Sequence, residues 1–165
     1  MAKDQSSLSW IIWCVIGLAI AVLVGLVFWN GRNLPAYKTN RELALACTTD
    51  MATQFHIHPH LEIFINGQPQ EIPADIGIIQ NCMNSLHTHE NSGEIHVESP
   101  EKRDFTLADF FAVWQKIYNK EQILDYKVDA RHVIRQTLNG QETQEYENII
   151  LHDDDKIIIY YEEIK

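Results

Sequence analysis

The longest apolar stretch of the chain lies near its N-terminus. Ile11 to Trp29 reads IIWCVIGLAIAVLVGLVFW, and no charged residue occurs between Asp4 and Arg32. A helix of about 20 residues, rising ~1.5 Å per residue, crosses the ~30 Å hydrocarbon layer of a bilayer. The stretch exceeds the apolar core of a signal peptide, and no small-x-small cleavage site follows it before Arg32. We therefore predict a retained anchor over residues 10–30, after an N-terminal tail at 1–9.

An alternation of polar and apolar residues follows a linker predicted at 31–53, in which RELALAC is expected to form a short helix. One parity holds Phe55, Ile57, Leu61, Ile63 and Ile65, and the other holds His56, His58, His60 and Glu62. A period of two predicts a strand with one packed face and one face of imidazole and carboxylate groups. Pro59 is expected to interrupt its ladder pairing locally.

Two Asn-Gly pairs predict hairpins, because both residue types tolerate positive φ. Asn66-Gly67 ends the first alternation, and its return strand is expected to reach about Ile72. Asn139-Gly140 predicts a second hairpin, and Lys156 to about Glu162 a terminal strand. Between the hairpins lies another alternation, which sets Glu94, His96 and Glu98 on one face and Ile95 and Val97 on the other.

The segment TLADFFAVWQKIY predicts the main soluble helix. Thr106 and Asp109 form a capping pattern, and the apolar positions 107, 110, 111, 114, 117 and 118 have helical spacing. Its aromatic residues are interpreted as core that covers a sheet. Two hairpins, one helix and a final strand predict an α+β domain over residues 54–165, similar in pattern to the β-grasp type.

The charge of −10 lies almost wholly outside the apolar stretch, which argues against nucleic acid or anionic lipid as the main partner and favours cations. Six of the eight histidines fall within 41 residues, from His56 to His96. Neutral imidazole is the commonest side-chain metal ligand. The predicted metal ligands are His56, His58, His60, His87, His89, His96 and Cys82. His132 and His152 stand apart and are interpreted as hydrogen-bonded or solvated residues.

The metal depends on which softer donors join the imidazoles. Sulfur from Cys82 or Met83 would favour copper, whereas Glu62, Glu90, Glu94 or Glu98 would suit zinc, iron or manganese. Copper is the leading prediction, with zinc or iron as alternatives. Cys82 has a second interpretation, a disulfide with Cys47, which would leave an imidazole site for copper or zinc.

Four motifs carry a resemblance: HIHPHLEIFING, LHTHE, GEIHVE and FTLADFFAVW, which span about Phe55 to Trp114. They resemble the pattern H-x-H-x-H-L-x-I-x-x-N-G, L-H-T-H-[D/E], G-x-I-H-x-E and F-T-L-x-x-F-F-x-x-W of a group of prokaryotic membrane-anchored proteins, largely uncharacterised. The resemblance implies that the histidine positions are the shared feature of the group. Glu90 stands where aspartate is expected, and as a ligand its longer stem would alter the geometry.

Three functions fit the sequence. The first is an extracytoplasmic, membrane-anchored protein that binds copper and delivers it to a membrane cuproenzyme. The second is a small metalloenzyme with zinc or iron and a glutamate base, although no other catalytic motif is found. The third is an accessory subunit of a membrane complex. The basic residues Arg32, Lys38 and Arg41 alone would place the domain in the cytoplasm, whereas a short tail before an acidic domain favours the outside.

Overall fold

The computed structural model describes residues 5–32, 38–49 and 53–164. Residues 1–4 of the expected tail, and 33–37 and 50–52 of the expected linker, therefore lie outside the described residues. The chain divides into two compact units, Met1–Tyr37 and Lys38–Lys165.

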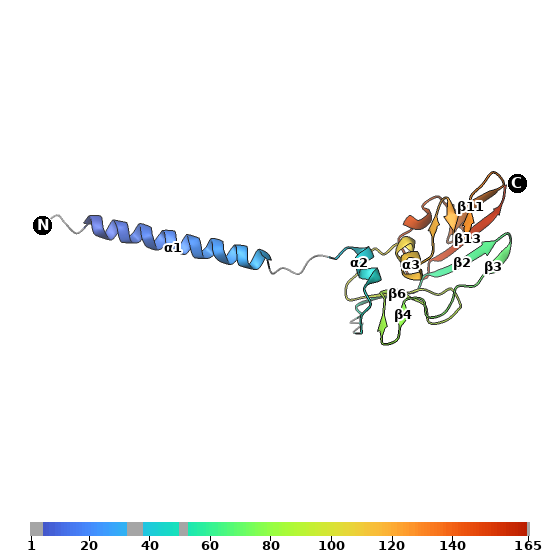
Figure 1. The fold of residues 1–165 in the computed structure, drawn as a ribbon, viewed down its shortest axis with the longest axis horizontal. Coiled ribbons are helices and arrows are strands. Elements are labelled where there is room, and N and C mark those ends of the chain that lie inside the picture. Colours follow the sequence, from blue (N-terminus) through green and yellow to red (C-terminus); the bar gives the residue numbers. More distant parts are fainter. Residues whose placement is uncertain (1–4, 33–37, 50–52, 165) are drawn as a thin grey trace. The chain divides into compact units, whose positions relative to one another are not determined.

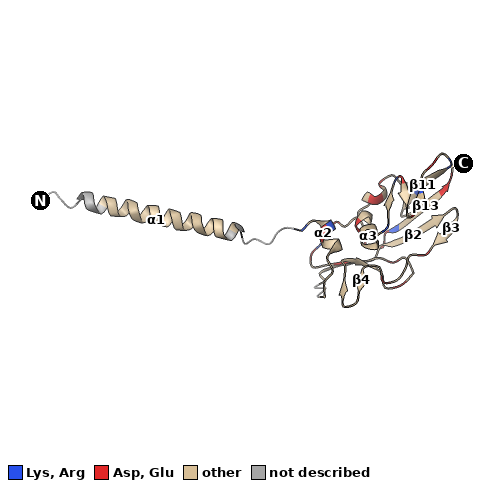
Figure 2. Ribbon diagram, in the orientation of Figure 1, with Lys and Arg blue, Asp and Glu red and all other residues tan. Residues whose placement is uncertain are grey.

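The first unit contains one helix, α1 (Gln5–Arg32). Its segment Ser9–Trp29 has 21 residues and a mean hydropathy of 3.0, and by length and composition it is able to cross a membrane. At ~1.5 Å per residue the segment is about 32 Å long, close to the ~30 Å hydrocarbon thickness. Figure 2 shows the part of α1 between Ser9 and Trp29 without a charged residue. The single N-terminal apolar helix predicted from the sequence is confirmed.

The second unit is built around a five-stranded sheet of order β12-β11-β13-β2-β3 (Figure 1). Its strands β13 and β2 are parallel. On one side β11 pairs antiparallel with both β13 and β12, and on the other side β3 pairs antiparallel with β2. Asn66, Gly67, Asn139 and Gly140 have positive φ and form the two turns. This order confirms the α+β prediction and is that of a β-grasp sheet. The strands are β2 (His60–Ile65), β3 (Gln68–Gln70), β11 (His132–Leu138), β12 (Gln141–Thr143) and β13 (Lys156–Glu163).

Helix α3 (Leu107–Trp114) supplies the aromatic part of the core. Phe110 and Phe111 are buried in one cluster with the inward residues of the central strands, such as Ile159. The Asp109 carboxylate accepts hydrogen bonds from the backbone N–H and the hydroxyl of Thr106 at 2.9 and 3.1 Å, which confirms the predicted cap. The core role of the aromatic residues is confirmed too.

The helix is shorter than its apolar spacing predicts. It ends at Trp114 because Gln115 adopts the left-handed conformation, with φ of 59°. Tyr118 instead begins a strand, so including positions 117 and 118 in the helix was wrong. The segment after the helix forms a three-stranded antiparallel sheet of β8 (Tyr118–Asn119), β9 (Gln122–Ile123) and β10 (Tyr126–Lys127), and a short 3-10 helix η1 (Tyr146–Asn148) precedes β13.

Helix α2 (Asn40–Leu45) belongs to the folded domain, although its sequence was assigned to the linker. Ala44 is fully buried, and Arg41 Nε lies 2.6 Å from the Asp109 carboxylate of α3. A disulfide joins Cys47, just after α2, to Cys82 of β5. The compact unit therefore begins at Lys38 rather than at the expected boundary of 54. The small ladder that holds Cys82 consists of β4 (Ile78–Ile79) and β5 (Cys82–Met83).

Candidate metal centre

The segment HIHPH changes sheets at its proline. Residues before it form β1 (Phe55–Ile57), which pairs with β7 (His96–Ser99), whereas His60 begins β2 of the large sheet. The Pro59 carbonyl accepts a hydrogen bond of 2.9 Å from the Ile95 N–H, and the Leu61 N–H donates one of 2.9 Å to Gly93 O. These two bonds fasten the segment that leads into β7 to the point where the chain changes sheets. The predicted interruption at Pro59 is confirmed, because a residue without an N–H ends the ladder there.

The small sheet has the order β1-β7-β6, where β6 is Leu86–His87. Strand β7 pairs His56 with Glu98 on one side and His96 with His87 on the other. His58 follows the end of β1, and its ring centroid lies 4.8 Å from that of His96. Ile57, Val97 and Leu86 of the same strands are buried in the core. The alternation therefore gathers the imidazoles of three neighbouring strands on the opposite face.

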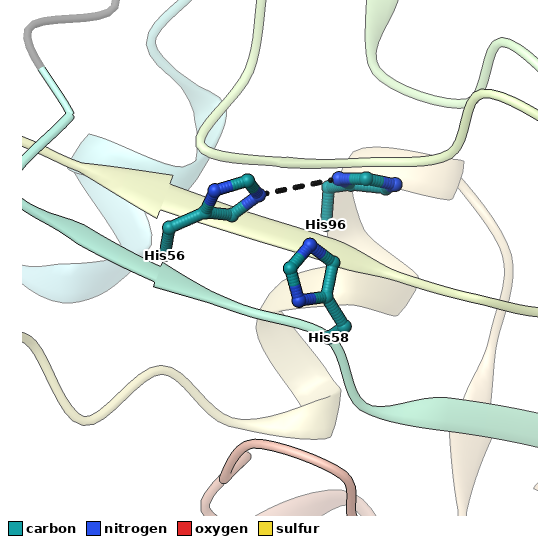
Figure 3. A group of neighbouring side chains, drawn as sticks. All are labelled: His56, His58 and His96. Atoms are coloured by element: carbon teal, nitrogen blue, oxygen red, sulfur yellow. Dashed lines mark hydrogen bonds between the residues drawn. The ribbon is translucent and has the colours of Figure 1, made fainter.

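The imidazoles form two groups of three that share His96. The outer triad consists of His56, His58 and His96, and the inner triad of His87, His89 and His96. In each triad the three candidate ligand atoms lie within 4.8 Å of one another. Figure 3 shows the imidazoles of the outer triad pointing toward one another, with His56 Nε2 3.4 Å from His96 Nδ1.

A backbone carbonyl orients the buried imidazole of the inner triad. His87 is fully buried, and its Nδ1–H donates to the Asn84 carbonyl at 3.0 Å. A neutral imidazole has one N–H, so Nε2 of His87 keeps its lone pair and faces Nε2 of His89 at 3.2 Å. Metal-binding histidines commonly donate their second nitrogen to a carbonyl in this way.

Thr88 fixes the two histidines that flank it. Its side chain is fully buried and points away from them, into the segment from Pro73 to Ile76. The Thr88 hydroxyl donates to the Pro73 carbonyl at 2.8 Å and accepts from the Ile76 N–H at 3.1 Å. Its backbone N–H donates to Ile76 O at 3.0 Å, and its carbonyl accepts from the Asp75 N–H at 2.9 Å. Four bonds on one residue therefore determine where His87 and His89 lie.

Carboxylates surround the outer triad. Glu98 Oε1 lies 3.1 Å from His56 Nε2, Glu94 Oε1 lies 3.2 Å from His96 Nε2, and Asp153 Oδ1 lies 3.6 Å from His58 Nδ1. Asp153 also accepts the backbone N–H of His58 at 2.8 Å. These groups can orient the imidazoles or contribute oxygen ligands.

Two imidazoles of the inner triad, His87 and His96, have a lowered pKa. Burial lowers the pKa of His87, although its bond to the Asn84 carbonyl acts in the opposite direction. Burial, followed by the neighbouring His89 and His58, lowers the pKa of His96. Both rings are therefore neutral near pH 7, the form in which a nitrogen lone pair is free for a metal.

Five of the predicted ligands come together: His56, His58, His87, His89 and His96. His60 joins neither triad, because the switch at Pro59 carries it into the other sheet, where its Nδ1 lies 3.9 Å from Glu62 Oε1. The prediction that Cys82 is a metal ligand is wrong, because its sulfur is bonded to Cys47 and offers no thiolate. Glu90 is exposed and lies in neither triad.

His132 and His152, which lie outside both triads, have the hydrogen-bonded or solvated positions expected of them. His132 Nδ1 lies 2.9 Å from Asp129 Oδ1, and its ring stacks on Tyr161. His152 Nδ1 lies 3.2 Å from Asp155 Oδ2. The residues that sequence reasoning missed are Asn84, Thr88 and Asp153. Asp153 belongs to the Asp-Asp-Asp run that is visible in the sequence before the last strand. Its position beside His58, however, follows only from the parallel pairing of β13 with β2.

The nitrogen separations suit coordination of one ion. Two imidazoles at 2.0–2.1 Å from a tetrahedral metal have their nitrogens about 3.3 Å apart. The His87–His89 separation is 3.2 Å and the His56–His96 separation is 3.4 Å. Each triad thus contains one pair already at the separation that a shared ion requires. The third nitrogen of each triad lies within 4.8 Å of the other two.

No family model, curated protein or solved structure matches the chain. The class of protein that the fold and site define is therefore a coarse one: an α+β domain with histidine groups able to hold a metal ion, preceded by one apolar helix.

Proposed function

We propose that this chain is a membrane-anchored, extracytoplasmic protein that binds copper and delivers it to a membrane client. The observation that carries the proposal is the convergence of five imidazoles on one face of the β1-β7-β6 sheet, with ligand atoms in each triad within 4.8 Å of one another. Histidines this close, with two of them kept neutral by burial, are arranged for a cation.

The donors favour a divalent metal of the late first row. With Cys82 in a disulfide, the ligands are imidazole and carboxylate rather than thiolate. Such sites bind Cu²⁺ more tightly than the other divalent metals of that row, with Zn²⁺ as the main competitor and iron weaker. The proposal of copper therefore no longer depends on sulfur ligands. It depends on the order in which nitrogen ligands bind the divalent metals.

The disulfide also supports the extracytoplasmic side, because such bonds persist in oxidising compartments. The helix Ser9–Trp29 supports a tether that keeps the domain close to a membrane cuproenzyme or another membrane complex. A tether raises the effective concentration of the two partners and so speeds transfer without any extra contact. A reporter fused to the C-terminus would test the orientation directly.

Metal analysis of the full chain, purified in detergent without added metal and then exposed to Cu²⁺ or Zn²⁺, tests the binding. The wild type is expected to retain about one equivalent of copper after desalting, since ligand sets of this kind bind tightly at neutral pH. His96→Ala removes the ligand common to both triads and should abolish retention.

His60→Ala is the matched control for that variant. It removes a similarly placed imidazole whose side chain is 38 % exposed and which joins neither triad. Equal loss of copper in both variants, or no copper in the wild type, would refute the proposal. Bound zinc or iron accompanied by turnover of a substrate would favour the metalloenzyme instead.

A further inference from the structure

His96 occupies the middle of the imidazole cluster. Its ring centroid lies 5.6 and 4.8 Å from those of His56 and His58, and 5.4 and 4.6 Å from those of His87 and His89. This follows from the sheet order, since β7 lies between β1 and β6. The two triads are therefore neighbours that require the same side chain.

A neutral imidazole has a single nitrogen lone pair, because its other nitrogen carries the proton. His96 can thus complete the outer triad or the inner triad at a given moment, but not both. An ion held by three imidazoles in one triad leaves only two in the other. The two triads therefore compete for His96.

The two triads differ in exposure. In the outer triad the side chains of His56 and His58 are 42 % and 37 % exposed, whereas in the inner triad His87 is fully buried. An incoming chelator or acceptor ligand can therefore displace both non-shared imidazoles of the outer triad. The inner triad has one ligand that solvent does not reach.

The two triads also differ in charge. Glu98 and Asp153 lie 3.1 and 3.6 Å from His56 and His58, the two imidazoles that belong to the outer triad alone. The inner triad is braced by the neutral Asn84 carbonyl and by the bonds of Thr88. Acidic groups on an open face attract a cation and raise its rate of arrival. These differences suit the outer triad to exchange of an ion with other ligands and the inner triad to retention of the ion.

We propose that the two triads are two positions of one divalent ion. The outer triad takes the ion up and gives it away, the inner triad holds it, and His96 remains a ligand in both. This inference rests on the proposed function and specifies the route by which the ion is loaded and released. The step is an exchange of ligands and involves no change of oxidation state.

A position that the ion only passes through, on its way to or from the inner triad, changes the rate of uptake and the rate of release by the same factor. Removing the outer triad should therefore slow uptake and release by the same factor and leave the equilibrium affinity unchanged. A ligand of the resting ion behaves differently, because its loss speeds release. His89 is itself exposed and offers a direct path to the inner triad, so the kinetic comparison decides between the two routes.

The experiment measures Cu²⁺ uptake by the full chain in detergent, and its removal by excess EDTA, in a stopped-flow instrument. His56→Gln combined with His58→Gln removes the outer imidazoles while keeping polar side chains of similar size. Both rate constants are expected to fall by the same factor while the affinity stays the same, because the variant removes the outer imidazoles and keeps Glu98 and Asp153. His60→Gln is the matched control and should behave as wild type. His89→Gln should release copper faster.

Three results would overturn the inference. Unchanged rates in the His56→Gln/His58→Gln variant would mean that the ion does not pass through the outer triad. Faster release from that variant would make the outer imidazoles ligands of the resting ion. Two copper ions per wild-type chain would show that the triads do not compete. In each case copper binding itself persists, whereas a wild type without copper would refute the proposed function as well. Circular dichroism establishes that each variant is folded.

Discussion

Replacing Cys47 and Cys82 together with alanine separates the two roles that the sequence allows for Cys82. As a disulfide the pair stabilises the fold, and as a thiolate Cys82 would bind metal. The structure joins the two sulfurs across a sequence separation of 35 residues. The bond fastens the segment after α2 to β5, where the backbones of Thr48 and Met83 exchange two hydrogen bonds of 2.9 Å.

The expected loss of stability follows from the size of the closed loop. Cross-linking a loop of about 35 residues removes chain entropy from the unfolded state that corresponds to about 4 kcal/mol at 25 °C. This is a large part of the 5–15 kcal/mol by which domains are typically stable. With a urea dependence of about 2 kcal/mol per molar, the midpoint of unfolding should fall by about 2 M.

Urea titration of the full chain in detergent, followed by circular dichroism, measures that shift, and copper analysis of the same samples measures binding. The double variant and each single variant should lose the same stability, because either substitution breaks the bond. All three should retain copper under conditions where they are folded. A midpoint that does not move would refute the entropy argument, and loss of copper from Cys82→Ala but not from Cys47→Ala would restore Cys82 as a ligand.

Other substitutions test how the site and the anchor are supported. Gly93→Ala should destabilise the domain by more than about 2 kcal/mol, because Gly93 has φ of +87° and a Cβ there would lie 2.3 Å from Leu61 O. Gly67→Ala, at φ of +79° with open space around it, is the control and should cost about 1 kcal/mol in the same urea titration. Asp109→Asn should cost about 1–2 kcal/mol through the lost charge at the cap and the half-exposed Arg41 pair; an unchanged midpoint would contradict this. Ala19→Arg, at the centre of Ser9–Trp29, should reduce the membrane-bound fraction in a flotation assay, since a central arginine costs about 3 kcal/mol; unchanged flotation would argue against a spanning helix.

The features that sequence predicted well depend on neighbours along the chain. The parity of His56 and His58, the turn at Asn66-Gly67 and the cap at Asp109 are each set within a few residues, and the structure has all of them. The helix end at Trp114 was missed because Ile117 and Tyr118 continue the apolar spacing, although the fold places Tyr118 in β8 instead, where it is buried. Local pattern does not reveal that competition.

Membership of the histidine cluster depends instead on which strands pair. His60 has the same parity as His56, yet Pro59 separates them into different sheets. His96 is shared by both triads only because β7 lies between β1 and β6, an order that no local pattern encodes. The choice between thiolate and disulfide at Cys82 likewise required the position of Cys47, far away in the sequence.

Backbone hydrogen bonds and apolar packing hold the strands that carry the imidazoles. Gly93 and Pro59 accept backbone hydrogen bonds that tie the segment before β7 to the start of β2, and Ile95 and Val97 are buried in the core. Sites that assemble only when metal binds draw their folding energy from the ion. Here backbone hydrogen bonds and apolar packing support the strands that carry the imidazoles. Under the proposed function, this support would let the domain release its ion to another protein without unfolding.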